Sequence, residues 1–544
     1  MVHDTQIMPS NQYQKVLDML QLDINILQDF DVFCEDGHIH INVTLKKKMH
    51  SCPICSSATA TTHSYVVKKI RHSVLHTAPC TIHYRARRYI CPSCHKTFYE
   101  NNPFSFDGEH SSAATVYCVL SDLKSPQETF RSIGQRYHMS ASTVISIFDR
   151  HVDIPRLPLP RILSIDEVYV PTDEGNKYLC VLMNFETMEI VDVLPSRKKD
   201  ALIAYFSGIP RDERCNVEIV SADLWVSYHD VASFMLPLCH TSVDKFHLLM
   251  ELSRQISTIR IKTMKYFGHI KKHYFEEKKK RKLTPDEEFQ YRKACMSYYA
   301  LKKFNWLFFT SNQYYFDPNT KKKYNKVFQK YMNYLDIYDY MIHCNEDLEK
   351  ALFLKDDFET FFKTCTYDDA GETLDNLIRD FKASHIDEMK HFAGTLAQWR
   401  NEIINSFIPI NGDNELVNNS RIESVNKKIK TLKRCANGYR SFSRLRNRIM
   451  YVCNPNATYS LSPIKRKENK QTMKDTINEI YRLKITEEGP RIINEEEMLE
   501  ELYDEIIEIK EMLDSLYDQN MSILDNQYGI INDKLDLKDD DIRF

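Results

Sequence analysis

Two Cys-x-x-Cys pairs, Cys52/Cys55 and Cys91/Cys94, constrain the fold of this chain more than any other feature. Each pair has the spacing that places two thiolates on one metal ion, and four thiolates complete the closed tetrahedral shell of a structural zinc site. Residues 45–99, which contain both pairs, include ten Lys or Arg and no Asp or Glu. The sequence therefore predicts a zinc-binding unit that contacts a polyanion such as nucleic acid. The alternative is a zinc ribbon that only supports its neighbours.

Length and composition limit the class of protein. A chain of 544 residues is too long for one hydrophobic core, so three or four domains are expected. No stretch of eighteen or more apolar residues is present, which excludes a membrane-spanning helix. Fifteen Cys without a secretory signal favour a reducing cytoplasm.

The net charge of −3 hides an asymmetry along the chain. Residues 491–544 contain 17 acidic and 5 basic residues, a net charge of −12, so residues 1–490 carry +9. A basic body with an acidic tail is typical of a nucleic-acid protein whose tail is a spacer, a partner site or a self-inhibiting decoy. Apolar residues of the tail fall on heptad a and d positions, which favours a coiled coil. The alternative is an acidic helix that only adds solubility.

Residues 1–104 are predicted to form an N-terminal hairpin and the zinc-binding domain. We expect a helix at 13–27 and then a β-hairpin of residues 31–33 and 38–43. Residues 81–90 alternate apolar and basic side chains, which predicts a strand with one cationic face. The candidate DNA contacts of this domain are its cations Lys68, Lys69, Arg71, Arg85, Arg87 and Arg88.

Residues 105–154 change to a helical pattern. Apolar residues at helical spacing describe two short helices with a break at residues 137–140, and Ser140 or Ser142 can cap the second helix. This is the outline of a helix-turn-helix DNA-binding domain with an exposed second helix, although any small helical bundle would look similar. The candidate DNA contacts of the second helix are Ser142, Thr143 and Arg150.

After a proline-bounded linker, residues 155–250 show the pattern of a mixed α/β sheet, with three adjacent strands followed by helix, strand, helix and strand. The expected strands are 162–170, 178–185, 189–194, 216–222 and 241–243, with helices at 199–206 and 227–234. Residues 251–410 are almost wholly helical, with no strand candidate of comparable strength, and predict a helical insertion. Residues 411–462 complete the α/β domain with the basic helix 421–433, and residues 463–544 form a linker and the acidic helical tail.

Two carboxylates stand at strand ends of the predicted sheet. Asp166 lies inside the first strand, where an unpaired buried charge would be costly, and Asp223 ends the fourth strand. If these two strands are adjacent, both carboxylates emerge side by side and can hold one or two Mg²⁺ ions. Taken alone, each Asp is equally well explained as a former of a strand-end turn.

Glu423, on the basic helix, is the candidate third ligand. Lysines four and seven residues further along lie on the same helix face, and a carboxylate beside lysines suits an enzyme that grips a phosphodiester strand. The cations of this region are Lys427, Lys430, Lys433 and Arg434, and Arg440, Arg444, Arg446 and Arg448 continue the positive field. The alternative is a capping box, in which Ser420 and Glu423 only begin the helix.

Asp244 and His247 follow the fifth strand as Asp-Lys-Phe-His. Either residue could cap a helix or support the metal ligands from behind, and both could act on the metal directly. The sequence leaves these roles open.

Taken in order, the motifs resemble a known family. Cys-Pro-x-Cys occurs twice and is followed by the two short helices, Ser-Ile-Asp-Glu, Asp-x-Phe-His and Asn-x-Arg-Ile-Glu-x-x-Asn-x-x-Ile-Lys with Gly-Tyr-Arg-x-Phe. Over about residues 50–455 the chain is similar to bacterial insertion-sequence transposases of the ISL-three type, and residues 420–448 are the most specific part. The acidic tail is not part of this pattern.

The resemblance implies a fold and an activity. It implies an RNase H-like DDE catalytic domain in which Asp166, Asp223 and Glu423 hold Mg²⁺ or Mn²⁺, preceded by zinc-binding and helix-turn-helix units that bind the terminal inverted repeats of the element. It also implies a homodimer or higher oligomer on double-stranded DNA, in the bacterial cytoplasm at the nucleoid.

Two other functions share part of these features. A DNA-binding regulator derived from a transposase would keep the zinc-binding and helix-turn-helix units without cleaving DNA. A metal-dependent nuclease would use the same three carboxylates but would not join strands.

Overall fold

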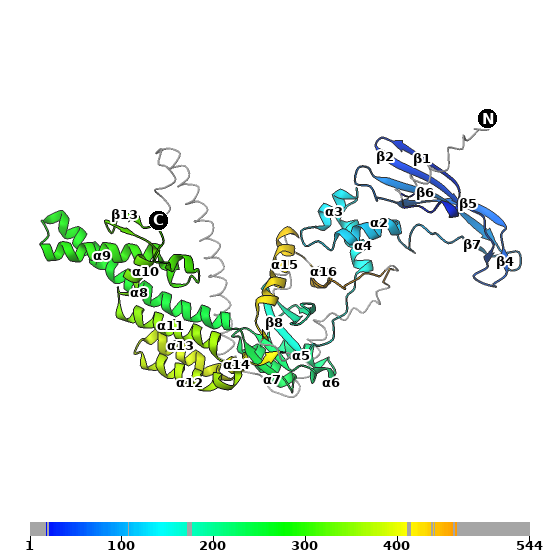
Figure 1. The fold of residues 1–544 in the computed structure, drawn as a ribbon. Helices are drawn as coiled ribbons and strands as arrows, with labels where there is room; N and C mark the ends of the chain where they lie inside the picture. Colours follow the sequence, from blue (N-terminus) through cyan, green and yellow to red (C-terminus); the bar gives the residue numbers. More distant parts are fainter. Residues whose placement is uncertain are drawn as a thin grey trace, which may run out of the picture. The chain divides into compact units, whose positions relative to one another are not determined.

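The computed structural model describes Asp18 and residues 21–464, except 107, 171–176, 411–414, 437–438, 440 and 461–462 (Figure 1). The chain divides into two compact units, one of residues 1–247 and 401–469 and one of residues 248–400 and 470–544. The predicted coiled-coil tail lies outside the described residues, as do residues 13–17, 19 and 20 of the predicted helix 13–27. None of the helices in the described segments is long and apolar enough to cross a membrane.

The N-terminal sheet has the strand order β1-β2-β6-β5, with β7 paired to β6. Its strands are β1 (Leu27–Glu35), β2 (His38–Leu45), β5 (Thr62–Arg71), β6 (Cys80–Ile90) and β7 (Thr97–Tyr99), and a small hairpin of β3 (His50–Ser51) and β4 (Ala58–Thr59) lies beside it. The predicted hairpin is confirmed, and its turn places Asp36 and Gly37 at positive φ. At the end of the predicted helix, Ile24–Ile26 form a 3-10 turn (η1) and Leu27 already begins β1, because Leu27 is buried in the core of this sheet.

Three short helices follow the N-terminal sheet: α2 (Ala113–Asp122), α3 (Phe130–Arg136) and α4 (Ala141–His151). The predicted cap is confirmed, because the Ser140 hydroxyl accepts from the backbone N–H of Thr143. Gly134 of α3 is required for the close approach of the two helices, since a Cβ atom there would lie 2.7 Å from the carbonyl oxygen of Met139. The turn between α3 and α4 is therefore tight and well defined.

The central sheet is mixed, as predicted, with the strand order β10-β9-β8-β11-β12. Its strands are β8 (Ile162–Tyr169), β9 (Tyr178–Asn184), β10 (Ile190–Leu194), β11 (Ile219–Ala222) and β12 (His240–Val243). Strand β8 pairs antiparallel with β9 and parallel with β11, and β11 pairs parallel with β12. The first and fourth strands of this region are thus neighbours, which is the arrangement on which the carboxylate prediction depends.

Helices cover both faces of the central sheet. They are α5 (Lys199–Ser207), α6 (Arg211–Arg214) and α7 (Val226–Met235) before β12, and α14 (Arg400–Asn405), α15 (Ser420–Ala436) and α16 (Phe442–Cys453) after the insertion, where β15 (Pro409–Ile410) and β16 (Glu415–Leu416) also pair. Ile165 of β8 joins a core with α5 and α7, whereas Val168 joins the opposite core with α15, α16 and α2–α4. The three short helices and α15 therefore share one core with the sheet.

The second unit is mainly helical between residues 248 and 400. Its helices are α8 (Lys245–Lys280), α9 (Pro285–Lys303), η2 (Asn305–Phe308), η3 (Gln313–Phe316), α10 (Tyr334–Ile342), α11 (Glu346–Thr364), α12 (Tyr367–Ala383) and α13 (Asp387–Gln398). A two-stranded ribbon of β13 (Lys323–Asn325) and β14 (Lys330–Met332) corrects the prediction of a segment without strands. Its strands are too short for the sequence pattern to reveal.

Candidate active site and zinc centre

The zinc centre is built from two loops with the same backbone geometry. In the first loop the N–H of Ser56 donates to the carbonyl oxygen of Cys52, and in the second the N–H of His95 donates to that of Cys91. Both Ser56 and His95 have positive φ, near 60° and 56°. Each loop turns back on itself within four residues, which brings both cysteines of a pair to the same side.

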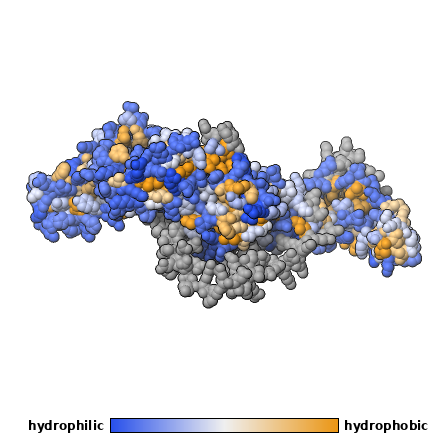
Figure 2. Space-filling model, turned by 90° about the horizontal axis from the view of Figure 1, so that it is seen from below, coloured by the Kyte–Doolittle hydropathy of each residue, from blue (hydrophilic) through white to orange (hydrophobic). Residues whose placement is uncertain are grey.

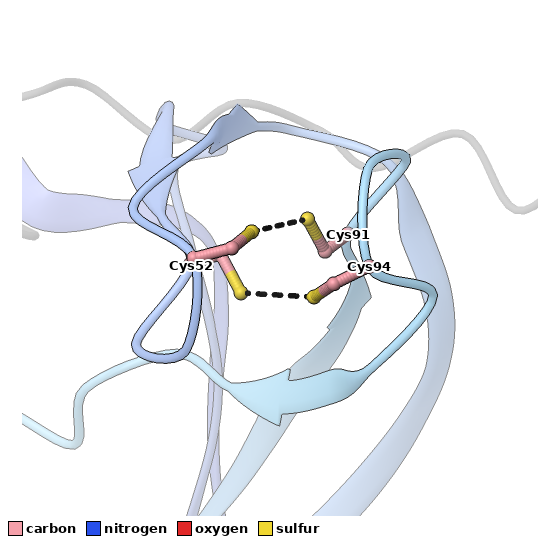
Figure 3. Close-up of side chains that lie close together, drawn as sticks. Cys52, Cys91 and Cys94 are labelled. Atoms are coloured by element: carbon pink, nitrogen blue, oxygen red, sulfur yellow. Dashed lines mark hydrogen bonds between the residues drawn. The ribbon is translucent and has the colours of Figure 1, made fainter.

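The four thiols converge between the loops (Figure 3). The Sγ atoms of Cys52 and Cys94 are 3.6 Å apart, and those of Cys55 and Cys91 are 3.5 Å apart. Among the described residues, these cysteines form the one group of three or more His, Cys, Asp or Glu whose ligand atoms all lie within 4.8 Å of one another. Hydrogen bonds from Ser57 lower the pKa of Cys55 to about 6, which favours the thiolate that a metal requires. The set fits a structural Zn²⁺.

The cations of the N-terminal sheet do not share one face, which corrects the prediction for residues 81–90. Arg85 lies over the ring of Tyr65, whereas Arg88 lies near Tyr99, and the two arginines are on opposite faces because they are three residues apart on β6. Lys68, on the neighbouring strand, also lies over Tyr99.

Arg87 is buried, with 2% of its surface exposed, and is not available to a ligand. Its guanidinium donates to the carbonyl oxygen of Leu45 at 2.6 Å and to the side chain of Gln28 at 2.7 Å, and it forms an ion pair with Glu100 at 3.4 Å. Arg87 therefore joins β1, β2 and the end of β7 inside the fold. The prediction that it contacts DNA is wrong, because its partners come from three other segments of the chain and enclose its side chain in the fold.

The predicted DNA contacts on α4 differ in their exposure and in their binding partners. Ser142 is exposed and its hydroxyl bonds to that of Ser140 at 2.8 Å, while Thr143 is half-buried in the first turn. Arg150 forms an ion pair with Glu109 at 2.9 Å and donates to the carbonyl oxygen of Gly108 at 3.0 Å. The first turn of α4 is therefore more accessible to a ligand than its last turn.

The central sheet brings Asp166 and Asp223 together. Asp166 is on β8 and Asp223 directly follows β11, and these strands are parallel neighbours. Burial raises the pKa of Asp166 well above its ordinary value, and the charge of Asp223 adds to the increase. A buried carboxylate such as Asp166, whose proton affinity is raised by burial and by a neighbouring negative charge, is stabilised by a bound cation.

A row of serines lies two residues before these carboxylates on neighbouring strands. Ser164, Ser221 and Ser242 pair in register across β8, β11 and β12, and all three are buried. Each serine precedes an aspartate by two residues, so Asp166, Asp223 and Asp244 follow on the same side of three neighbouring strands. The Ser-x-Asp sequence repeated on three strands is a signal that could have placed Asp244 in this row from the sequence.

Two asparagines of the Glu423 helix bind the two aspartates. Asn419, directly before α15, donates from Nδ2 to Oδ1 of Asp223 at 2.8 Å, and Asn426 donates from Nδ2 to Oδ2 of Asp166 at 2.5 Å. The hydroxyl of Ser221 donates to Oδ1 of Asn419 at 2.8 Å and so fixes the orientation of that amide. Sequence reasoning did not assign these asparagines a role.

Glu423 lies between the two asparagines in the helix, four residues after Asn419 and three before Asn426. Residues at these spacings share one helix face, so Glu423 is on the face that contacts the aspartates. Helix α15 begins at Ser420, whose hydroxyl donates to Asn418, so Ser420 lies inside the first turn and is not its cap. The described ligand atoms of Glu423, Asp166 and Asp223 do not all lie within 4.8 Å of one another.

His247 connects two of the aspartates. Its Nε2 is 3.1 Å from Oδ2 of Asp223, and its Nδ1 is 3.3 Å from Oδ2 of Asp244. Burial lowers the pKa of His247, but the hydrogen bonds to the two carboxylates outweigh it and raise the pKa to about 10. The imidazolium therefore neutralises part of the negative charge of this group in the absence of a metal ion.

A second ionic group supports β8 from the opposite face. Glu167 forms an ion pair with Arg197 at 2.6 Å and accepts from the Tyr228 hydroxyl at 2.9 Å. The Arg197 guanidinium lies over the rings of both Tyr178 and Trp225, at 4.4 and 4.5 Å from their centroids. This buried network fixes the strand that carries Asp166.

The cations after Glu423 fall into two groups. Lys427, Lys430 and Arg434 are exposed, whereas Lys433 donates to the carbonyl oxygen of Tyr169 at 2.8 Å. The arginines of α16 bind partners inside the protein, which corrects the prediction of a continued positive field. Arg444 pairs with Asp149 at 2.7 Å, and Arg446 pairs with Asp192 at 2.6 Å. Arg448 is 1% exposed and donates to the carbonyl oxygens of Ser125 and Glu128.

Comparison with known protein families agrees with this geometry. A family model described as transposase, the DDE domain of the ISL3 (ISL-three) type, matches residues 163–449, just over half of the chain. A second model, described as the zinc-finger of transposase IS204/IS1001/IS1096/IS1165, matches residues 48–94. The first match spans all three carboxylates and both asparagines, and the second spans both cysteine pairs. No curated protein matches the chain.

Proposed function

Because the chain belongs to the ISL3-type transposase family, we propose that it is the transposase of an insertion sequence, which binds the terminal inverted repeats of its element and catalyses metal-dependent cleavage and transfer of DNA strands. The observation that carries this proposal is the pair of carboxylates, Asp166 and Asp223, on neighbouring parallel strands beneath the helix face that bears Glu423. We propose that the sheet is RNase H-like and that these three residues are the DDE triad.

The donor set fits Mg²⁺ or Mn²⁺, which prefer carboxylate oxygens. Asp166, Asp223 and Glu423 would hold the metal ions, which when bound activate water and stabilise the attacking and leaving oxygens of a phosphodiester. Asn419 and Asn426 orient the two aspartates, and His247 with Asp244 holds the free oxygen of Asp223. The exposed Lys427, Lys430 and Arg434 on α15 would bind the phosphates of the strand to be cut.

DNA recognition is assigned to the parts before the sheet. We propose that α3 and α4 form a helix-turn-helix whose recognition helix reads bases through Ser142 and Thr143, and that Lys68, Lys69, Arg71, Arg85 and Arg88 bind phosphates. We also propose the domain boundaries predicted from the sequence, and a homodimer or higher oligomer on DNA.

A nicking and strand-joining assay with oligonucleotides that carry the element ends tests the proposal. Asp166→Ala and Glu423→Ala are expected to abolish both cleavage and joining while the protein still binds the ends. The matched control is Asp212→Ala, which removes an exposed carboxylate on α6 of the same unit and is expected to leave both reactions unchanged.

The products separate the remaining functions. Cleavage that survives both Asp166→Ala and Glu423→Ala would refute the assigned triad. Cleavage without joining would indicate a nuclease, and specific binding without any cleavage by the unmodified chain, in the presence of Mg²⁺, would indicate a DNA-binding regulator.

A further inference from the structure

The two halves of the helical unit carry opposite charge. Residues 248–332 contain 20 Lys or Arg and 7 Asp or Glu, a net charge of +13, whereas residues 333–400 contain 7 basic and 15 acidic residues, a net charge of −8. The first half comprises most of α8, α9 and the β13–β14 ribbon, and the second comprises α10–α13. In Figure 1, α9 and β13 lie at one end of this unit and α12 and α13 at the other. The positive charge is therefore carried by α8, α9 and the ribbon, and α10 is the helix of the acidic half that packs against α9 and the ribbon.

Exposed aromatic residues follow the positive charge. Eight large aromatic side chains are exposed in the basic half, against two in the acidic half, Phe353 and Tyr367. Those of the basic half are Tyr266, Phe275, Phe289, Trp306, Phe309, Tyr314, Tyr324 and Tyr331. Figure 2 shows a largely hydrophilic surface over this unit that hydrophobic residues interrupt. Solvated cations alone do not require exposed aromatic side chains, whereas surfaces that contact DNA phosphates use Tyr hydroxyls together with Lys and Arg.

The ribbon is the most sharply defined part of this surface. Tyr324 and Tyr331 are direct cross-strand partners, with ring centroids 5.5 Å apart, and are 51% and 71% exposed. The other side of the ribbon is anchored, because Asn325 and Met332 are buried and Phe328, in the turn, packs against the ring of Tyr340. The tyrosine pair is thus presented on a firmly seated element.

Exposed lysines lie close to the tyrosine pair along the chain. Lys321, Lys326 and Lys330 are exposed, and no ion pair involves them within the described part of the chain. By contrast, the lysines at the end of α8 are neutralised by nearby glutamates, as in the pair of Lys278 with Glu288 at 2.9 Å. The charge of the three ribbon lysines is therefore not neutralised by any described residue of this unit.

We infer that the β13–β14 ribbon and the basic half of the helical unit form a DNA-binding surface that contacts phosphates without reading sequence. This surface is separate from the predicted zinc, helix-turn-helix and α15 contacts, and it suits DNA that flanks the element or target DNA. The inference rests on the proposed function only for its choice of DNA as the polyanion.

The test measures binding of the full chain to duplex DNA that lacks element ends, without Mg²⁺, at a series of salt concentrations. The variant K321Q/K326Q/K330Q removes the unpaired lysines, and K350Q/K363Q/K382Q removes three exposed lysines of the acidic half as the matched control. Each phosphate contact adds about 0.9 to the slope of log K against log salt, so the ribbon variant is expected to lose about 2 to 3 in slope. The control variant is expected to keep the slope of the unmodified chain.

A conservative variant guards against misfolding. K321R/K326R/K330R keeps the charge and is expected to keep the slope, and thermal unfolding of all three variants must match that of the unmodified chain. An unchanged slope for the ribbon variant, or an equal loss in the control, overturns the inference. Cleavage of a short element-end oligonucleotide that extends only a few base pairs beyond the cut site is expected to survive the ribbon variant, so loss of the proposed function and loss of this surface remain distinguishable.

Discussion

In the zinc centre, four sulfur atoms lie within 4.8 Å of one another on two short loops, whereas the three carboxylates proposed to bind Mg²⁺ come from two strands and a helix separated by up to about half the chain. The cysteine loops have matching backbone geometry and hold the thiols in place by local hydrogen bonds. Two of the three carboxylates, Asp166 and Asp223, are held by bonds from residues distant in the chain, Asn419, Asn426 and His247.

This difference corresponds to the two uses of a metal ion in proteins. A structural site has a closed ligand shell and contributes directly to folding, whereas a catalytic site leaves coordination positions for substrate and water. The asparagines and His247 hold the aspartates in position without a metal ion, and the charge of His247 partly neutralises them. Zinc is thus expected to be part of the fold, and Mg²⁺ to be part of the reaction.

Removal of zinc is the largest test of this comparison. A strong chelator, or the substitutions Cys52→Ser and Cys91→Ser together, is expected to unfold the zinc loops and destabilise the N-terminal sheet, since structural zinc contributes on the order of 10 kcal/mol in small domains. Zinc content and thermal unfolding measure the effect. Withdrawal of Mg²⁺ is expected to lower the unfolding temperature far less than removal of zinc does.

The matched control for this experiment is Cys34→Ser, which changes an exposed cysteine of β1 outside the cluster. It is expected to retain zinc and its unfolding temperature. Stabilisation of the fold by Mg²⁺ as strong as that by zinc, or a purified protein that binds no zinc, would contradict this distinction between the two metal sites.

The local features of the chain could be predicted from its sequence. The cysteine pairs, the hairpin, the two short helices and the strands of the central sheet depend on spacings of a few residues, which a pattern records directly. The adjacency of β8 and β11 entered the prediction only as the condition under which the two carboxylates meet, and the fold meets that condition.

Pairings over long separations could not be predicted. Arg444 and Asp149 are 295 residues apart, and Arg446 and Asp192 are 254 apart, so the sequence shows only cations where the fold makes ion pairs. The burial of Arg87 depends in the same way on residues outside its strand. The asparagine contacts with the aspartates are of this kind too, because an Asn at the start of a helix commonly caps it and an Asn within a helix commonly faces solvent.

The asparagines provide the next test. Asn419→Ala and Asn426→Ala are expected to reduce strand cleavage about 10- to 100-fold, as loss of residues that orient metal ligands typically does. The Mg²⁺ concentration needed for half-maximal rate is expected to rise, because each aspartate loses its orienting hydrogen bond. The assay is cleavage of element-end DNA at varied Mg²⁺.

A shift in Mg²⁺ dependence separates a positioning role from a structural one, which would lower stability without moving that dependence. The control Asn456→Ala changes an exposed asparagine of the same unit that bonds to Glu189. If the asparagine variants cleave at the unmodified rate, the carboxylates need no support from α15, and their site resembles the self-contained zinc centre more closely than proposed.

The smallest effect is expected in the serine row, where two neighbours differ in a single bond. Ser221→Ala removes the donor that fixes the Asn419 amide, whereas Ser164→Ala removes a buried hydroxyl that has no hydrogen-bond partner in the described structure. One hydrogen bond contributes about 1 kcal/mol, so Ser221→Ala is expected to slow cleavage about fivefold and Ser164→Ala to leave it unchanged or stabilise the fold slightly. Equal effects of both substitutions would show that the row fills space between strands and does not extend support to Asp223. A larger effect of Ser221→Ala would establish that the carboxylate site depends on a residue that acts on Asp223 through Asn419. The zinc loops, by contrast, hold their cysteines by hydrogen bonds within each loop.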